Sequence, residues 1–175
     1  MEVLDSIKNR FSPYDFTAQQ ITEEQLLTLL KAAGMAASAF NEQPWRFIYA
    51  LQQDEQEFKN MHDCLVEGNQ GWTKGVSALV ITVVSKNYAK NGKENTVAKH
   101  DLGLAVGNLT IQASSMGLHL HQMAGIDHDK TIEKLNIPEG FEPLTAIAIG
   151  YYEGEKTIKP KKAIKEIAFK GRWSA

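Results

Sequence analysis

The hydrophobic positions along the chain change spacing from segment to segment, and each spacing predicts one kind of element. Apolar residues three and four apart predict helices over residues 3–7, 22–34, 54–65, 95–116 and 130–135. Alternating or continuous apolar runs predict strands over residues 46–51, 77–84, 118–123 and 144–151. Thr22 and Gln25 have the spacing of a capping box, and Gly34 and Gly117 suit helix ends. Helices and strands therefore alternate along the chain.

Three segments add detail to this pattern. Residues 77–84 are almost continuously apolar and rich in β-branched side chains, which predicts a central strand covered on both faces. The polar stretch 86–94 predicts a loop or lid. Residues 158–175 hold six Lys or Arg residues without a clear helical face, which favours a C-terminal arm. With no linker or repeat, residues 1–175 are expected to form a single domain.

Composition narrows the class of protein. Of 175 residues, 43% are hydrophobic and 23% are charged, which is typical of a folded globular chain. A net charge of -2 with mixed signs gives no overall attraction for nucleic acid or an anionic membrane. Cys64 is the only cysteine, so an intrachain disulfide is excluded and a reducing, cytoplasmic location is expected. The N-terminus lacks the pattern of a secretory signal, and no apolar run reaches the length of a membrane span.

A loop rich in small residues follows the second predicted helix. It reads Ala36-Ala37-Ser38-Ala39-Phe40-Asn41-Glu42-Gln43-Pro44-Trp45. Small side chains let a planar ring approach the backbone, and Ser38 and Asn41 offer hydrogen-bond donors and acceptors. The alternative interpretation is a polar turn beside a core tryptophan.

Two basic segments lie near the ends of the chain. The first reads Asn9-Arg10-Phe11-Ser12-Pro13-Tyr14, and a guanidinium beside a hydroxyl suits a phosphate. Taken alone, an arginine beside a serine is more often a solvated helix end. The second reads Lys159-Pro160-Lys161-Lys162, which by itself indicates an exposed tail.

These segments, with two others, resemble the nitroreductase family. The others are His121-Gln122-Met123-Ala124-Gly125-Ile126 and Asn69-Gln70-Gly71-Trp72. Together with His100-Asp101-Leu102-Gly103-Leu104-Ala105 they extend the resemblance through nearly the whole chain. It implies an α+β fold, a nitroreductase-like three-layer sandwich with a mixed central sheet flanked by helices, and a homodimer joined through its long central helices.

The resemblance also implies an FMN-dependent oxidoreductase. NAD(P)H would give a hydride to the flavin, and a nitroaromatic, quinone or similar small molecule would then take the electrons, in a ping-pong sequence. The reacting part would be the backbone N–H of Ala124 at flavin N5, with Gly125 permitting close approach. The residues implied to bind FMN are Arg10, Phe11, Ser12, Tyr14, Ala37, Ser38, Ala39, Asn41, Asn69, Gln122, Met123, Ala124, Gly125, Lys159 and Lys161.

Departures from the family pattern keep another function open. Ala37 replaces the usual proline, and Phe11 and Tyr14 replace cationic or imidazole side chains. Ala124 also replaces a glutamate that some relatives have. These changes motivate an alternative function, an FMN-binding storage or sensing protein with little turnover. A metal site is not expected, because His119 and His121 have no second ligand cluster at a suitable spacing.

Overall fold

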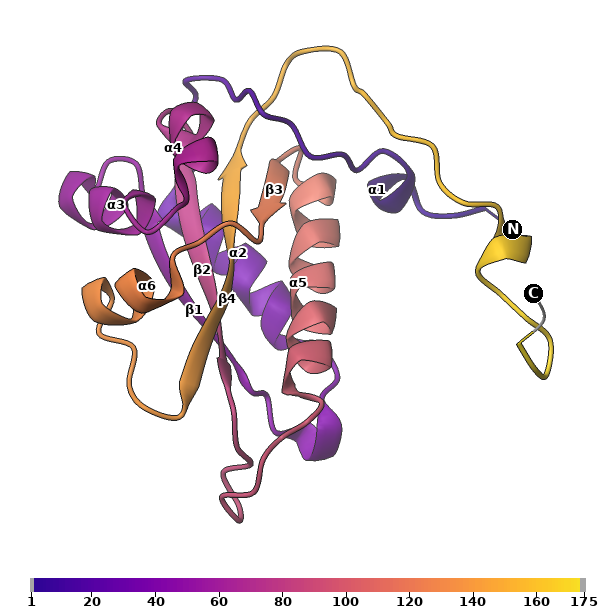
Figure 1. The fold of residues 1–175 in the computed structure, drawn as a ribbon. Helices are drawn as coiled ribbons and strands as arrows, with labels where there is room; N and C mark the ends of the chain where they lie inside the picture. The colour runs from indigo at the N-terminus through magenta and orange to yellow at the C-terminus, as the bar shows by residue number, and fades with distance from the viewer. Residues whose placement is uncertain (1, 174–175) are drawn as a thin grey trace.

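A four-stranded antiparallel sheet forms the middle layer of the molecule (Figure 1). The structure is a computed structural model and describes residues 2–173. The strands lie in the order β1-β2-β4-β3. Their bounds are β1 Trp45–Leu51, β2 Ala78–Ser85, β3 His119–Met123 and β4 Phe141–Gly150. The predicted strands are thus confirmed, with their ends shifted by a few residues.

The α+β class is confirmed, but the expected mixed sheet is wrong for the strands described, which pair only antiparallel. β2 and β3 do run in the same direction and are connected through the long helix α5 (Ala98–Ser115). β4 lies between them and pairs antiparallel with each. A strand-helix-strand sequence is typical of parallel neighbours, and it does not reveal that a later strand is inserted.

Helices cover both faces of the sheet. α2 (Glu23–Gly34) packs with α5 on one face, while α3 (Glu55–His62) and α6 (His128–Lys134) lie on the other (Figure 1). β2 contributes to both cores because its side chains alternate. Val80 packs on the α5 side, and Leu79 and Ile81 pack on the α3 side. The central, doubly covered strand predicted for residues 77–84 is therefore confirmed.

The remaining helices are short. They are α1 (Asp5–Lys8), α4 (Glu67–Thr73) and the 3-10 turns η1 (Ala39–Asn41) and η2 (Ile164–Glu166). The capping box of α2 is confirmed. Thr22 N–H donates to Gln25 Oε1 at 2.9 Å, and Gln25 N–H donates to Thr22 Oγ1 at 3.2 Å. These bonds satisfy backbone donors that the first turn leaves free and fix where α2 begins.

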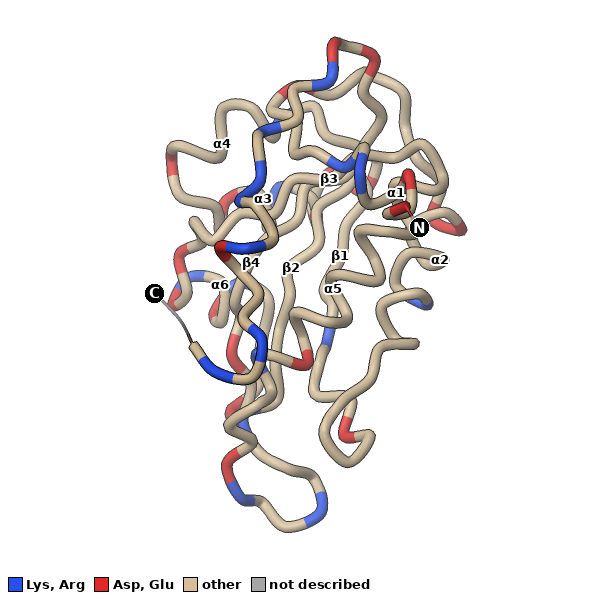
Figure 2. The backbone as a smooth tube through the Cα atoms, turned by 90° about the vertical axis from the view of Figure 1, so that its right-hand side faces the viewer, with Lys and Arg blue, Asp and Glu red and all other residues tan. Residues whose placement is uncertain are grey.

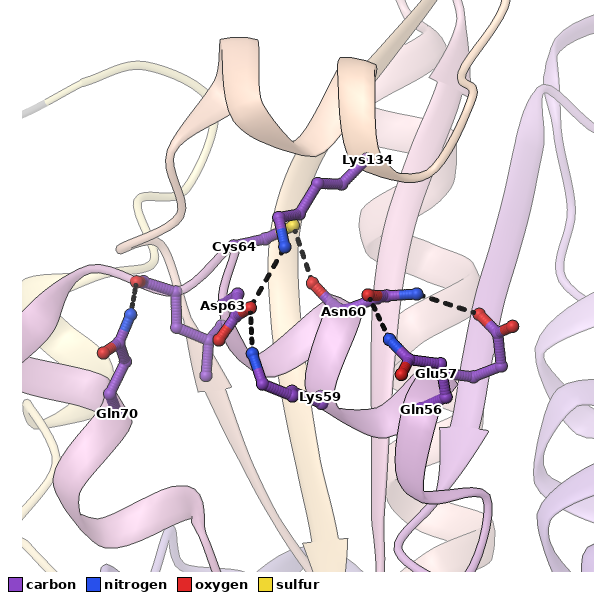
Figure 3. Close-up of polar contacts among 9 residues, drawn as sticks. Gln56, Glu57, Lys59, Asn60, Asp63, Cys64, Gln70 and Lys134 are labelled. Carbon is purple, nitrogen blue, oxygen red and sulfur yellow. Dashed lines mark hydrogen bonds and ion pairs between the residues drawn. The ribbon is translucent and has the colours of Figure 1, made fainter.

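A polar network joins α3 to α6 (Figure 3). Asp63 accepts hydrogen bonds from Lys59 at 2.7 Å and Lys134 at 3.0 Å, and both ammonium groups hold the pKa of Asp63 down to about 2. Cys64 beside it is buried, and its thiol donates to Asn60 O at 3.2 Å. Burial raises the pKa of the Cys64 thiol, which keeps it protonated and unreactive.

The chain after β4 leaves the sheet and runs past the N-terminal segment (Figure 1). Figure 2 shows the basic residues of this segment as a series of blue patches along the tube. Almost all of its described side chains are exposed. None of the helices within residues 2–173 combines the length and the hydrophobicity of a membrane span.

Candidate functional site

A cationic cavity lies between the N-terminal segment, β3 and the segment after β4. Its volume is about 230 Å³. Its lining includes six of the predicted FMN residues, Arg10, Phe11, Ser12, Tyr14, Lys159 and Lys161, together with His121, Thr157 and Ile158. Within it, Arg10 Nη1 donates to Ser12 Oγ at 3.3 Å. Residues about 150 positions apart therefore meet around one space that three basic side chains line.

Aromatic rings hold the wall of this cavity in place. His121 Nδ1 lies 2.8 Å from Pro13 O, which makes Nδ1 the donor, and Nε2 makes no hydrogen bond among residues 2–173. The His121 ring centre lies 4.5 Å from that of Tyr14 and 4.8 Å from that of Trp72. This packing connects the N-terminal segment and β3 to α4.

Phe11 contributes differently from the other predicted residues. It is buried, and its ring centre lies 5.0 Å from those of both His119 and Tyr152. Burial, followed by the nearby Lys156, lowers the pKa of His119, so this cluster supplies no charge to the cavity at neutral pH. Phe11 therefore supports the wall as a packing residue.

The loop after β3 is fastened to α4. Asn69 Nδ2 and Val66 N–H both donate to Gly125 O at 3.1 Å. A Cβ added at Gly125 would lie 2.7 Å from both Asn69 Nδ2 and Val66 Cγ2, so a side chain at this position would force its neighbours to shift. Gly125 thus permits close approach of the chain's own α4, a reason that the sequence did not reveal.

The same loop presents unpaired backbone donors. Ala124 is exposed, and in residues 2–173 neither its N–H nor that of Gly125 makes a hydrogen bond. These donors are available to an acceptor atom of a ligand. Met123 just before them is 4% exposed in the core, so only its backbone can face a ligand. Gln122 points toward α5, with Nε2 lying 3.5 Å from Thr110 Oγ1.

The loop containing Ala37 and Ser38 is anchored at the start of α5. Ala39 N–H donates to the buried Asp101 carboxylate at 3.0 Å, and Gln43 N–H donates to Ser38 Oγ at 2.9 Å. Phe40, Asn41 and Gln43 have φ of 54°, 58° and 49°, a left-handed conformation that is uncommon for non-glycine residues. Such conformations persist where the surrounding structure enforces them, and they cluster at functional sites.

The predicted site is divided between the two ends of α5. The Ala37–Asn41 segment binds the first turn of α5, whereas His119, which packs on Phe11, follows its last turn. An α5 of 18 residues is about 27 Å long. One chain therefore brings Arg10, Ser12, Tyr14 and the basic C-terminal residues together and leaves the Ala37–Asn41 loop apart from them.

Sequence reasoning did not assign His121 or Trp72 to the site. The segment that begins at His121 shows this residue as one of the alternating polar positions of a strand. Its position in the cavity depends on the fold, which this local pattern does not predict. No group of three His, Cys, Asp or Glu side chains suited to a metal ion occurs among residues 2–173.

Comparisons with known proteins find relatives along most of the chain. A model described as the nitroreductase family matches residues 7–71 and 51–151. The FMN reductase [NAD(P)H] of Bacillus subtilis is 26% identical over 91% of this chain and 70% of its own length. The major NAD(P)H-flavin oxidoreductase of Aliivibrio fischeri is 24% identical over 94% of this chain and 96% of its own. A solved structure titled as an oxidoreductase containing FMN is 33% identical, with a TM-score of 0.92 over 99% of this chain and 94% of its own.

Proposed function

Because the chain belongs to the nitroreductase family, we propose that it is an FMN-dependent oxidoreductase that takes a hydride from NAD(P)H and reduces nitroaromatics, quinones or similar acceptors. The observation that supports this most is the cationic cavity at β3, whose lining residue His121 precedes by three positions the loop in which the Ala124 and Gly125 N–H groups make no hydrogen bond among residues 2–173. The phosphate end of FMN and the electron-rich edge of its ring would both find hydrogen-bond donors within one region of the chain.

The residues present fit FMN. Arg10 offers a fork of donors for a phosphate that carries nearly two negative charges, and Ser12, Lys159 and Lys161 add further donors. A cavity of about 230 Å³ is smaller than the ~300–1,000 Å³ typical of a site that encloses a whole cofactor. We therefore assign it to the phosphate end, with the rest of the FMN extending beyond it.

The chain's own groups bind and orient, while a bound flavin supplies the capacity to accept and release a hydride at N5. The Ala124 N–H would donate a hydrogen bond to that atom. Asn69 uses Nδ2 to hold the loop, which leaves Oδ1 free to accept from a ring N–H. No side chain is required as an acid or base at this stage.

A homodimer would complete the site. The Ala37–Asn41 loop lies too far from Arg10 to meet the same flavin in one chain, so the loop of a second subunit would have to supply it. Apolar side chains are exposed between the two parts: Phe40 is 92% exposed, and Leu104 and Ile111 on α5 are 43% and 37% exposed. Pairing of two α5 helices would cover them and carry each loop to the other subunit's cavity.

The cavity is tested by titrating the apoprotein with FMN and following flavin fluorescence. Replacing a charged partner of phosphate removes a charge-assisted hydrogen bond, so we expect Arg10→Gln and Lys161→Gln to weaken FMN binding about tenfold or more. Lys162→Gln is the matched control, because Lys162 is the next basic residue in the chain and does not line the cavity. Equal affinities for all three variants would refute the assignment.

The two-subunit site is tested by complementation. One variant, Arg10→Gln/Lys161→Gln, inactivates the cavity, and the other, Ala37→Trp, blocks the loop at an exposed alanine. With random mixing, about half of the dimers contain one subunit of each variant, and one of the two sites in such a dimer combines an intact cavity with an intact loop. About a quarter of all sites should therefore regain activity. A site built within one chain would regain no activity on mixing.

A further inference from the structure

A second cavity lies at the far end of the sheet from Arg10. Its volume is about 590 Å³, within the range of small-molecule sites. It is formed where β2 ends and β4 begins, under the 86–97 loop and beside the first turn of α5. Glu142 lines it near the start of β4, whereas the Arg10 cavity lies beside β3, whose first residue pairs with Gly150 at the end of β4. The two cavities are therefore separate.

Asn95 is the most informative residue of this cavity. It is 4% exposed, and three of its polar groups are paired: N–H donates to Lys86 O at 2.8 Å, O accepts from Ala98 N–H at 3.1 Å, and Oδ1 accepts from Val97 N–H at 3.3 Å. Its Nδ2 is buried and has no hydrogen-bond partner in the part of the chain that the structure describes. A buried donor without a partner lowers the stability of the folded state by about 1–3 kcal/mol. A ligand atom that accepts a hydrogen bond from Asn95 Nδ2 would remove this penalty.

The start of α5 provides further donors at the same place. Val97, the N-cap residue, has no side-chain oxygen to cap the helix. The N–H groups of Thr96 and Lys99, both lining residues, make no hydrogen bond among the described residues. Free N–H groups and the positive end of the helix dipole attract an anion.

The charges of the lining limit what can bind. Lys99 is paired with Glu142 at 2.8 Å, and Lys86 and Glu94 carry the remaining positive and negative charges without an ion pair in residues 2–173. The side chains are thus neutral in sum. A small ligand with one anionic group fits this balance, whereas a polyanion would meet Glu94 and Glu142.

We propose that this cavity binds a small molecule through a single oxyanion, a carboxylate or a phosphate. Asn95 Nδ2, the free N–H groups at the start of α5 and the Lys86 ammonium are its donors. Within one chain, the lining of this cavity shares no residue with that of the Arg10 cavity.

The experiment is a titration of ¹⁵N-labelled, FMN-saturated protein with inorganic phosphate and, separately, with acetate, followed by NMR. FMN is kept saturating so that the Arg10 cavity is filled. We expect saturable chemical-shift changes of the Asn95 side-chain amide and the Lys99 N–H. The probe that binds more tightly shows whether the cavity prefers a phosphate or a carboxylate.

Three variants decide the assignment. Asn95→Asp keeps the Oδ1 acceptor for Val97 N–H but replaces the unpaired donor with a negative charge, so affinity should fall about tenfold or more. Lys86→Gln changes an exposed side chain and should weaken binding about threefold even if Asn95→Asp disturbs the fold. Lys90→Gln, in the same loop but outside the lining, should bind as the unchanged protein does.

Either of two results would overturn the proposal. One is the absence of saturable shifts with both probes, which would mean that water alone satisfies Asn95. The other is saturable binding that Asn95→Asp and Lys86→Gln leave unchanged, which would place the anion elsewhere.

Discussion

Gly125→Ala is the substitution whose effect the structure defines most closely. The new Cβ would lie 2.7 Å from both Asn69 Nδ2 and Val66 Cγ2, so both side chains, or the loop itself, must move. Losing the Asn69 hydrogen bond to Gly125 O costs about 1 kcal/mol, and overpacking adds about 1–3 kcal/mol. We expect the free energy of unfolding to fall by about 2–4 kcal/mol.

Urea unfolding measures this loss. With a slope of about 2 kcal/mol/M for a chain of this size, the midpoint should fall by about 1–2 M. FMN affinity should fall as well, because the Ala124 and Gly125 N–H groups move with the loop. Gly71→Ala is the matched control: Gly71 lies in α4 and a Cβ there meets nothing within 4 Å, so stability should stay equal or rise.

A second variant locates the collision. Asn69→Ala in the Gly125→Ala background removes one of the two clashing groups and should reduce the penalty, leaving the contact with Val66. If Gly125→Ala is as stable as the unchanged protein and binds FMN equally well, the close packing of this loop on α4 is refuted.

Three further substitutions test the fold and the dimer. Thr22→Ala removes the capping box and should lower stability by about 1 kcal/mol in the same urea assay, whereas an unchanged midpoint would contradict the role of the cap. Asp63→Asn should lower the free energy of unfolding by about 0.5–1 kcal/mol at neutral pH, because it removes the two ion pairs. Since the pKa of Asp63 is lowered to about 2, the difference in stability between the variant and the unchanged protein should disappear as the pH falls from about 4 to 2. A difference that stays constant over this range would contradict the ion pairs. Gly103→Ala meets nothing within 4 Å in its own chain and favours a helix, yet it should weaken the proposed dimer in sedimentation experiments; tighter or unchanged association would place α5 outside the interface.

Local patterns predicted most of the elements. The apolar run over residues 77–84 identified β2 because burial on both faces leaves no polar alternation, and Thr22 with Gln25 identified the start of α2. α4 was not predicted, since Gly68 and Gly71 lower its helix propensity and its position depends on contacts with the loop after β3.

Arrangement in space was harder to predict than the elements. The insertion of β4 between β2 and β3 depends on pairings between distant residues, which no local spacing encodes. The meeting of Arg10 with Lys159 was expected only from resemblance, and the structure brings the two residues to one cavity. The distance between that cavity and the Ala37–Asn41 loop follows from the length and direction of α5. It supports the second subunit that the resemblance had already implied.

The central claim is that the chain carries a flavin which exchanges a hydride with a nicotinamide donor. The most direct measurement is the visible absorbance of FMN-saturated protein after anaerobic addition of NADH or NADPH. The account predicts rapid loss of the oxidised flavin absorbance, followed by its return when a quinone or nitroaromatic is added. Bound flavin that stays oxidised with both donors would contradict it and favour a protein that stores or senses FMN.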